Sequence, residues 1–170
     1  YNIPTARYKK FKNYKLSTTY LKKSIYPIVI KVSGLASGKG VYISRNKNQA
    51  LKALKEIMIK KKFKKSGNEI IIEEFLDGEE ISFLALVDGN NYLPLLTSQD
   101  HKKVFEKDKG PNTGGMGAYC PVPFINKAIQ KKITKTIIEP TILAMKNEGR
   151  IFKGILYAGL MLKKNKIYLI

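Results

Sequence analysis

Two lysines flank a glycine-rich segment that has the residue types of a phosphate-binding loop. The segment, residues 33–41, reads SGLASGKGV; Lys31 lies on the predicted strand before it and Lys39 lies near its end. Backbone N–H groups in such a turn can come close to phosphate oxygens, and lysine neutralises their charge. The spacing is not that of a Walker loop, because only three residues separate Gly34 from Gly38, and the third glycine of a dinucleotide-binding fingerprint is absent. A plain glycine hairpin is the alternative for this segment.

A cluster of acidic residues follows the next predicted strand. It contains five of the chain's 13 acidic residues, namely Glu73, Glu74, Asp77, Glu79 and Glu80. Backbone groups at the end of a strand can hydrogen-bond the edge of an adenine ring, and a nearby carboxylate can accept hydrogen bonds from ribose hydroxyls. A solvated acidic turn is the simpler interpretation, but this concentration of acidic residues in a basic chain argues against it.

A third candidate site lies in residues 97–123, which show little hydrophobic periodicity. Residues 98–103 read SQDHKK and residues 110–119 read GPNTGGMGAY. Glycine, asparagine and threonine at this density provide backbone donors and small hydroxyls for a polar ligand. We expect a long functional loop here. His101 beside Asp100 could be a general base, but a positioning role is favoured because the sequence shows no second catalytic partner.

The elements that would position these residues alternate between strands and helices. The patterns predict helices at 16–24, from 46 and at 126–147, the last of them kinked or divided by Pro140. Strands are predicted at 28–32, 41–43, from 70, and at 81–87, 92–96, 154–162 and 166–170. This order predicts an α+β fold with two domains, residues 1–76 and 77–170.

Composition excludes several kinds of site. Cys120 is the only cysteine and His101 the only histidine, so neither an internal disulfide nor a cysteine- or histidine-rich metal site is available, and Cys120 is expected to pack as an apolar residue. No apolar run approaches the roughly 18 residues of a membrane helix, and we expect a cytoplasmic protein. The net charge is +19, but the lysines are scattered, which favours compositional drift over a specific nucleic-acid surface.

Taken together, the three candidate stretches resemble the glycinamide ribonucleotide synthetases (phosphoribosylamine–glycine ligases), ATP-grasp enzymes of purine biosynthesis. Residues 27–41 resemble the glycine-rich ATP loop of that family, residues 72–82 its adenine-binding strand, and residues 97–123 its substrate loop. The string at 110–119 is highly specific, and the resemblance extends over residues 3–170.

The resemblance implies an α+β ATP-grasp fold, with a lid subdomain in residues 1–76 and part of the core in residues 77–170. It implies that ATP converts glycine to glycyl phosphate, from which the amine of 5-phosphoribosylamine displaces phosphate to form an amide. Positioning and charge neutralisation suffice for such a reaction, so no catalytic nucleophile is expected. The implied ATP-binding residues are Lys31, Gly38, Lys39, Gly40, Val41, Glu73, Glu74, Phe75, Leu76 and Glu80, and the implied substrate-binding residues are Asp100, His101, Lys102, Asn112, Thr113, Gly114 and Gly115.

Two departures from the family pattern affect these expectations. Ser33 stands where many members have aspartate, and the family's ligands for Mg²⁺ or Mn²⁺ would follow Ile170. The chain begins with Tyr1 rather than methionine and ends in an apolar segment, so we expect N- and C-terminal parts beyond it and no full activity for this piece alone. The alternatives are another ATP-grasp carboxylate–amine ligase or carboxylase and, less favoured, a basic nucleic-acid-binding domain.

Overall fold

The computed structural model describes residues 1–36, 39–106 and 109–170, and the chain divides into two compact units. One unit is Ala6–Leu76, and the other combines Tyr1–Thr5 with Asp77–Ile170. The first five residues join the second unit because they run beside its last strand. Leu169 donates its backbone N–H to the carbonyl of Pro4 (2.8 Å), and the Thr5 hydroxyl donates to the carbonyl of Leu169 (2.8 Å).

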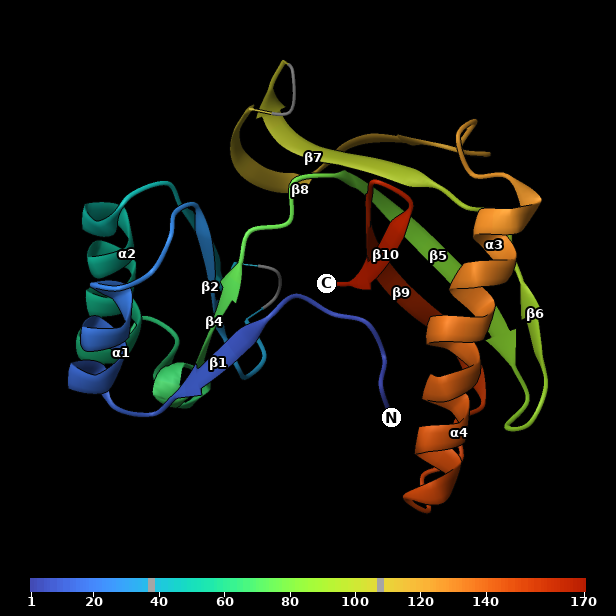
Figure 1. Cartoon of the computed structure of the whole chain (residues 1–170), viewed down its shortest axis with the longest axis horizontal. Helices are drawn as coiled ribbons and strands as arrows, with labels where there is room; N and C mark the ends of the chain where they lie inside the picture. The colour runs from blue at the N-terminus through green and yellow to red at the C-terminus, as the bar shows by residue number, and fades with distance from the viewer. Residues whose placement is uncertain (37–38, 107–108) are drawn as a thin grey trace. The chain divides into compact units, whose positions relative to one another are not determined.

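The unit Ala6–Leu76 is a four-stranded antiparallel sheet with two helices on one face (Figure 1). The strand order is β1 (Tyr8–Phe11), β4 (Ile70–Glu74), β2 (Ile28–Val32) and β3 (Val41–Ser44). The helices are α1 (Tyr14–Leu21) and α2 (Lys47–Leu54), which continues into the π-helical turn η1 (Lys55–Ile59); the short 3-10 helix η2 (Lys64–Asn68) then leads to β4.

Strand alternation and helix capping explain this packing. Ile30 of β2 and Ile72 of β4 are buried against the helices, together with Leu54 of α2. Their neighbours in sequence point to the opposite face of the sheet, because side chains alternate along a strand. Both helices begin at an asparagine cap: the side chain of Asn13 accepts from Leu16 N and that of Asn46 from Gln49 N, each at 3.0 Å.

The second unit contains a four-stranded antiparallel sheet covered on one face by a long helical segment (Figure 1). The strand order is β10 (Lys166–Leu169), β9 (Gly154–Lys163), β5 (Glu79–Val87) and β6 (Tyr92–Pro94). The helical segment consists of α3 (Lys127–Ile133), the π-helical turn η3 (Thr134–Ile138) and α4 (Glu139–Asn147). Phe83 and Leu160 of the sheet are fully buried with Ile137 of the helix. The change of helix type just before Pro140 agrees with the predicted division of this helix.

The expectation of a long loop at residues 97–123 is wrong. Most of this segment forms an antiparallel hairpin of β7 (Gln99–Phe105) and β8 (Lys109–Tyr119), with register shifts on either side of Lys103. Glycine, proline and asparagine lower strand propensity and interrupt alternation, so the side chains gave no strand signal. The hairpin is instead held by the backbone pairing of β7 with β8, which the pattern of apolar side chains does not reveal.

No helix within the described residues is both long enough and apolar enough to cross a membrane.

Candidate functional site

Lys31 and Glu73 form an ion pair on the sheet face opposite the helices of the unit Ala6–Leu76. In the register of β2 and β4, Glu73 lies opposite Val29 and Lys31 lies opposite Ile71, so both charged side chains project from the same face. Lys31 Nζ lies 2.8 Å from Glu73 Oε2, and the side chains are only 24% and 13% exposed. A pair with little access to water is held in a defined position, and its charges can act on a ligand with little screening.

The same sheet face offers apolar surface beside this ion pair. Val41 of β3 lies opposite Lys31, and Ile43 lies opposite Val29. Val41 and Ile43 are 45% and 44% exposed, which is high for branched apolar side chains on a strand. An exposed apolar strip next to fixed charges is suited to a planar ring that carries polar groups.

The glycine-rich loop joins β2 to β3 beside Lys31. The N–H of Val32 donates to the carbonyl of Gly40 (3.0 Å), and the N–H of Lys39 donates to the carbonyl of Ala36 (2.9 Å). These bonds fold the end of the loop back on β2 and leave Lys39 exposed. The predicted phosphate-binding residue Gly38 lies outside the described residues.

The residues after Glu73 differ in their environments. Glu74 forms an ion pair with Arg7: its carboxylate accepts the backbone N–H of Arg7 at 2.9 Å and the guanidinium group at 2.9 and 3.1 Å. The side chain of Phe75 is partly exposed, whereas that of Leu76 is buried. Phe75 and Leu76 lie beyond the end of β4, so their backbone groups are outside the sheet ladder.

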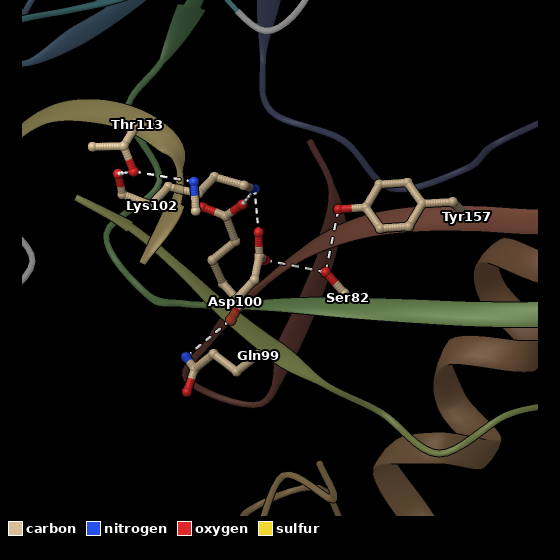
Figure 2. Close-up of polar contacts among 8 residues, drawn as sticks. Ser82, Gln99, Asp100, Lys102, Thr113 and Tyr157 are labelled. Atoms are coloured by element: carbon tan, nitrogen blue, oxygen red, sulfur yellow. Dashed lines mark hydrogen bonds and ion pairs between the residues drawn. The ribbon is translucent and has the colours of Figure 1, made fainter. Parts of the chain in front are cut away.

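In the second unit, Glu80, Asp100 and Lys102 form a charged cluster, of which Figure 2 labels Asp100 and Lys102. Lys102 Nζ lies 3.0 Å from Glu80 Oε1 on β5 and 3.1 Å from Asp100 Oδ2 on β7. Partial burial of the ammonium group lowers its pKa, but hydrogen bonds to Glu80 and Asp100, and their negative charges, raise the pKa of Lys102 well above its ordinary value. Lys102 is therefore a permanent cation at physiological pH.

Two residues that the sequence analysis did not select complete this cluster. Ser82 Oγ lies 3.3 Å from Asp100 Oδ1 and 3.2 Å from the hydroxyl of Tyr157 on β9 (Figure 2). Ser82 is one of the buried polar residues, and it interrupts an otherwise apolar run on β5. A serine within an apolar run does not by itself indicate a site, and nothing in the sequence indicated Tyr157.

Residues 112–115 of the hairpin are held beside Lys102 and Lys103 by backbone pairing and by the Thr113 hydroxyl. The Thr113 hydroxyl donates to the carbonyl of Lys102 (2.9 Å) and accepts the N–H of Gly115 (3.1 Å), while Asn112 pairs with Lys103 in the register. An added Cβ at Gly114 or at Gly115 would have no heavy atom within 4 Å, so the backbone here is open to a ligand.

His101 has an aromatic partner in the hairpin, and Gln99 has polar partners both in the hairpin and on β5. The exposed His101 ring stacks on Tyr119, with centroids 5.8 Å apart and planes at 19°. Gln99 is buried, donates to the carbonyl of Glu80 (2.9 Å) and accepts from the Tyr119 hydroxyl (2.5 Å).

The structure therefore brings some of the predicted site residues together. Lys31 pairs with Glu73 in one unit, and Lys102 pairs with Glu80 and Asp100 in the other. The His101 ring has a stacking partner and no acid–base partner among the described residues.

The whole chain, residues 1–170, matches the family described as the phosphoribosylglycinamide synthetase ATP-grasp (A) domain. The chain belongs to this family. A phosphoribosylamine–glycine ligase of Leptospira interrogans is 50% identical over 96% of this chain, which spans 38% of that relative. The chloroplastic ligase of the same name from Arabidopsis thaliana is 48% identical, again over 96% of this chain, which spans 31% of it. This A-domain chain thus spans about a third of the length of these relatives.

Solved structures show the same relationship for this A domain. The crystal structure of a phosphoribosylamine–glycine ligase from Thermotoga maritima superposes with a TM-score of 0.90 at 36% identity, covering 99% of this chain and 42% of that one. D-alanyl-alanine synthetase A from Vibrio cholerae has a TM-score of 0.72 at 15% identity, covering 98% of this chain and 49% of that one, and shares the fold alone. The α+β ATP-grasp fold and the family resemblance are therefore confirmed.

Proposed function

We propose that the protein containing this chain ligates glycine to 5-phosphoribosylamine at the expense of ATP. The observation that carries the proposal is the 50% identity to the Leptospira ligase over 96% of this chain. The charged clusters support it, because the Lys31–Glu73 pair and the cluster of Glu80, Asp100 and Lys102 provide charged groups of the kind that bind phosphates and polar substrates.

The proposed reaction has two steps that balance without an oxidant or a protein nucleophile. A carboxylate oxygen of glycine attacks the γ-phosphorus of ATP, which releases ADP and forms glycyl phosphate. The amine nitrogen of 5-phosphoribosylamine then attacks the glycyl carbonyl carbon, loses a proton and expels phosphate, which gives glycinamide ribonucleotide. The protein has to orient the reactants and exclude water, since an acyl phosphate hydrolyses readily.

We propose the following division of roles among residues of this chain. Lys31 would neutralise phosphate charge, and Glu73 would orient its ammonium group, with which it is paired at 2.8 Å. The exposed strip at Val41 would contact the adenine ring. Further nucleotide contacts are assigned to Gly38, Lys39, Gly40, Glu74, Phe75 and Leu76, and the contact to the ribose is assigned to Glu80. Contacts to glycine or to the ribosyl amine are assigned to Asp100, His101, Lys102, Asn112, Thr113, Gly114 and Gly115.

Mg²⁺ or Mn²⁺ is the metal expected with ATP, where it would neutralise triphosphate charge. Among residues 1–36, 39–106 and 109–170, no three His, Cys, Asp or Glu side chains come together as metal ligands. The roles above therefore involve only the side chains and backbone of this chain.

The proposal is tested on the complete gene product with purified substrates. We expect formation of glycinamide ribonucleotide from glycine, ATP and 5-phosphoribosylamine, and no product when bicarbonate replaces glycine. A carboxylated product, or no ligation by the complete protein, would contradict the proposal. The cytoplasmic location stays a prediction, to be checked by cell fractionation.

The role of Lys31 is tested by thermal stabilisation on addition of ATP. Lys31→Ala should abolish most of the ATP-dependent rise in melting temperature, because it removes a cation that binds phosphate and leaves Glu73 as an unpaired, poorly solvated carboxylate. Lys52→Ala is the matched control, since Lys52 is an exposed lysine of α2 in the same unit. Equal stabilisation of both variants by ATP would contradict the phosphate-binding role.

A further inference from the structure

A chain of hydrogen bonds links Tyr157 through Ser82 to the charged cluster of the second unit. The Tyr157 hydroxyl lies 3.2 Å from Ser82 Oγ, which lies 3.3 Å from Asp100 Oδ1. The other oxygen of Asp100 lies 3.1 Å from Lys102 Nζ. Figure 2 shows Asp100 between Ser82 on one side and Lys102 on the other.

The direction of the hydrogen bonds in this chain follows from donor and acceptor capacity. An ionised carboxylate only accepts, so the single hydrogen of the Ser82 hydroxyl is donated to Asp100. The oxygen of Ser82 then has lone pairs left, and Tyr157 must donate to it. Tyr157 therefore acts on Asp100 only by fixing the orientation of the Ser82 hydroxyl.

The backbone holds Ser82 and Tyr157 in place for this contact. Ser82 exchanges two backbone hydrogen bonds with Ser98, at 2.8 and 3.1 Å, and on its other side lies opposite Gly159 of β9. A Cβ on Gly159 would lie 3.4 Å from the Tyr157 hydroxyl, so the tyrosine ring leans along the strand over the glycine. Tyr157 thus passes over Gly159, two positions away, and reaches Ser82.

Lys102 has donor capacity beyond the two carboxylates that it contacts. Its ammonium group has three hydrogens, and Glu80 and Asp100 accept two of them. The side chain is 34% exposed, so the third hydrogen can reach a ligand. One cation between two carboxylates leaves a net charge of −1, which disfavours a phosphate group and favours hydroxyl or amine groups.

We propose that Ser82 and Tyr157 are positioning residues which hold Asp100, and through it Lys102, against a hydroxyl or amine group of the acceptor substrate. The inference rests on the proposed ligase function and deepens it, because it names the chemical groups that Asp100 and Lys102 recognise. Neither Ser82 nor Tyr157 needs to touch the substrate. Their contribution is the fixed orientation of the two charged side chains.

A double-mutant cycle on the complete protein tests whether Tyr157 acts through Ser82. We expect Ser82→Ala and Tyr157→Phe each to lower kcat/KM for the ribosyl amine about five- to tenfold, the usual effect of losing one oriented hydrogen bond. The KM for ATP should change by less than about twofold. Because Tyr157 acts through Ser82, Tyr157→Phe should have no further effect once Ser82 is alanine.

Tyr92→Phe is the matched control for loss of a tyrosine hydroxyl. Tyr92 donates to Glu139 at 2.6 Å in the same unit but outside the cluster. This variant should keep the wild-type kcat/KM. Additive losses in the double variant, or no loss for Tyr157→Phe alone, would overturn the positioning role.

Side-chain NMR gives a second measurement that does not depend on ligase activity. With lysine labelled by ¹⁵N, the ammonium hydrogens of Lys102 should exchange with solvent several-fold faster in Ser82→Ala and Tyr157→Phe than in wild type or Tyr92→Phe. Unchanged exchange in all variants would contradict the proposal. If the complete wild-type protein makes no product but the exchange rates shift as expected, the ligase function fails while the hydrogen-bond chain stands.

Discussion

The lack of a side chain at Gly40 is required by close packing and not by backbone conformation. A Cβ built at this position would lie 2.3 Å from Val32 Cγ2 and 2.7 Å from Ala36 Cβ, distances at which atoms must move. Val32 also bonds to the carbonyl of Gly40, so a shift at either residue disturbs the end of the loop.

We therefore expect Gly40→Ala to lower the free energy of unfolding by about 1–3 kcal/mol, the usual cost of overpacking a well-packed site. Gly114→Ala is the control for stability, since a Cβ there meets no heavy atom within 4 Å and φ is not positive. Thermal melting of the complete protein measures both. Similar melting temperatures for the two variants would show that the loop accommodates the methyl group.

At the residue scale, the sequence predicted the charged members of both clusters but not their neutral partners. Lys31 and Glu73 could be selected because charged residues on a buried strand and at its end are unusual. Ser82 and Tyr157 could not, because their importance depends on which strands are adjacent. Only the pairing of β5 with β9 brings a serine and a tyrosine 75 positions apart into contact.

At the element scale, apolar strands were predictable and polar ones were not. The runs at Ile28–Val32 and Gly154–Lys163 carry β-branched or alternating apolar residues, and both form strands. The strand Tyr8–Phe11 had no such signal, because only Phe11 of its four residues is buried. It forms by pairing its backbone with β4 at the edge of the sheet, a tertiary effect that a local pattern does not contain.

The turn between β5 and β6 depends on one carboxylate. Asp88 accepts the backbone N–H of Asn90 (2.9 Å) and of Asn91 (2.7 Å), and its second oxygen accepts the Asn91 amide (3.1 Å). These hydrogen bonds, with the backbone bond from Asn90 the largest contribution, lower the pKa of Asp88 to about 2. The lowered pKa means that the ionised form stabilises the folded state.

This stabilisation should be present above the unfolded pKa of about 4 and be lost as the pH falls from 4 towards 2. Asp88→Asn removes the charge, so we expect a lower melting temperature than wild type at pH 6 and a smaller difference at pH 2. Asp77→Asn is the control, because Asp77 is exposed and makes no such turn hydrogen bonds among the described residues. A constant difference between Asp88→Asn and wild type at both pH values would contradict the assignment.

At the scale of the whole molecule, positive charge is concentrated in the unit that carries the glycine-rich loop. Ala6–Leu76 contains 18 of the 32 Lys and Arg residues and four of the 13 acidic residues. A field of this sign attracts any polyanion, so composition alone could not separate a nucleotide-binding domain from a nucleic-acid-binding one. The match of this chain to an ATP-grasp domain family favours the nucleotide.

The charge distribution predicts how nucleotide binding by the complete protein depends on salt. Raising the ionic strength from about 0.05 to 0.5 M shortens the screening length severalfold, so the KM for ATP should rise about two- to fivefold. The KM for glycine should change little, because a zwitterion has no net charge to be attracted.

A variant with reversed charges tests the same point. Lys60→Glu combined with Lys65→Glu should make the dependence of the KM for ATP on ionic strength shallower, since both lysines are exposed in the basic unit and lie away from the Lys31–Glu73 pair in sequence. An ATP KM that is insensitive to salt, or a glycine KM that rises equally, would show that the excess of lysine has no role in nucleotide capture.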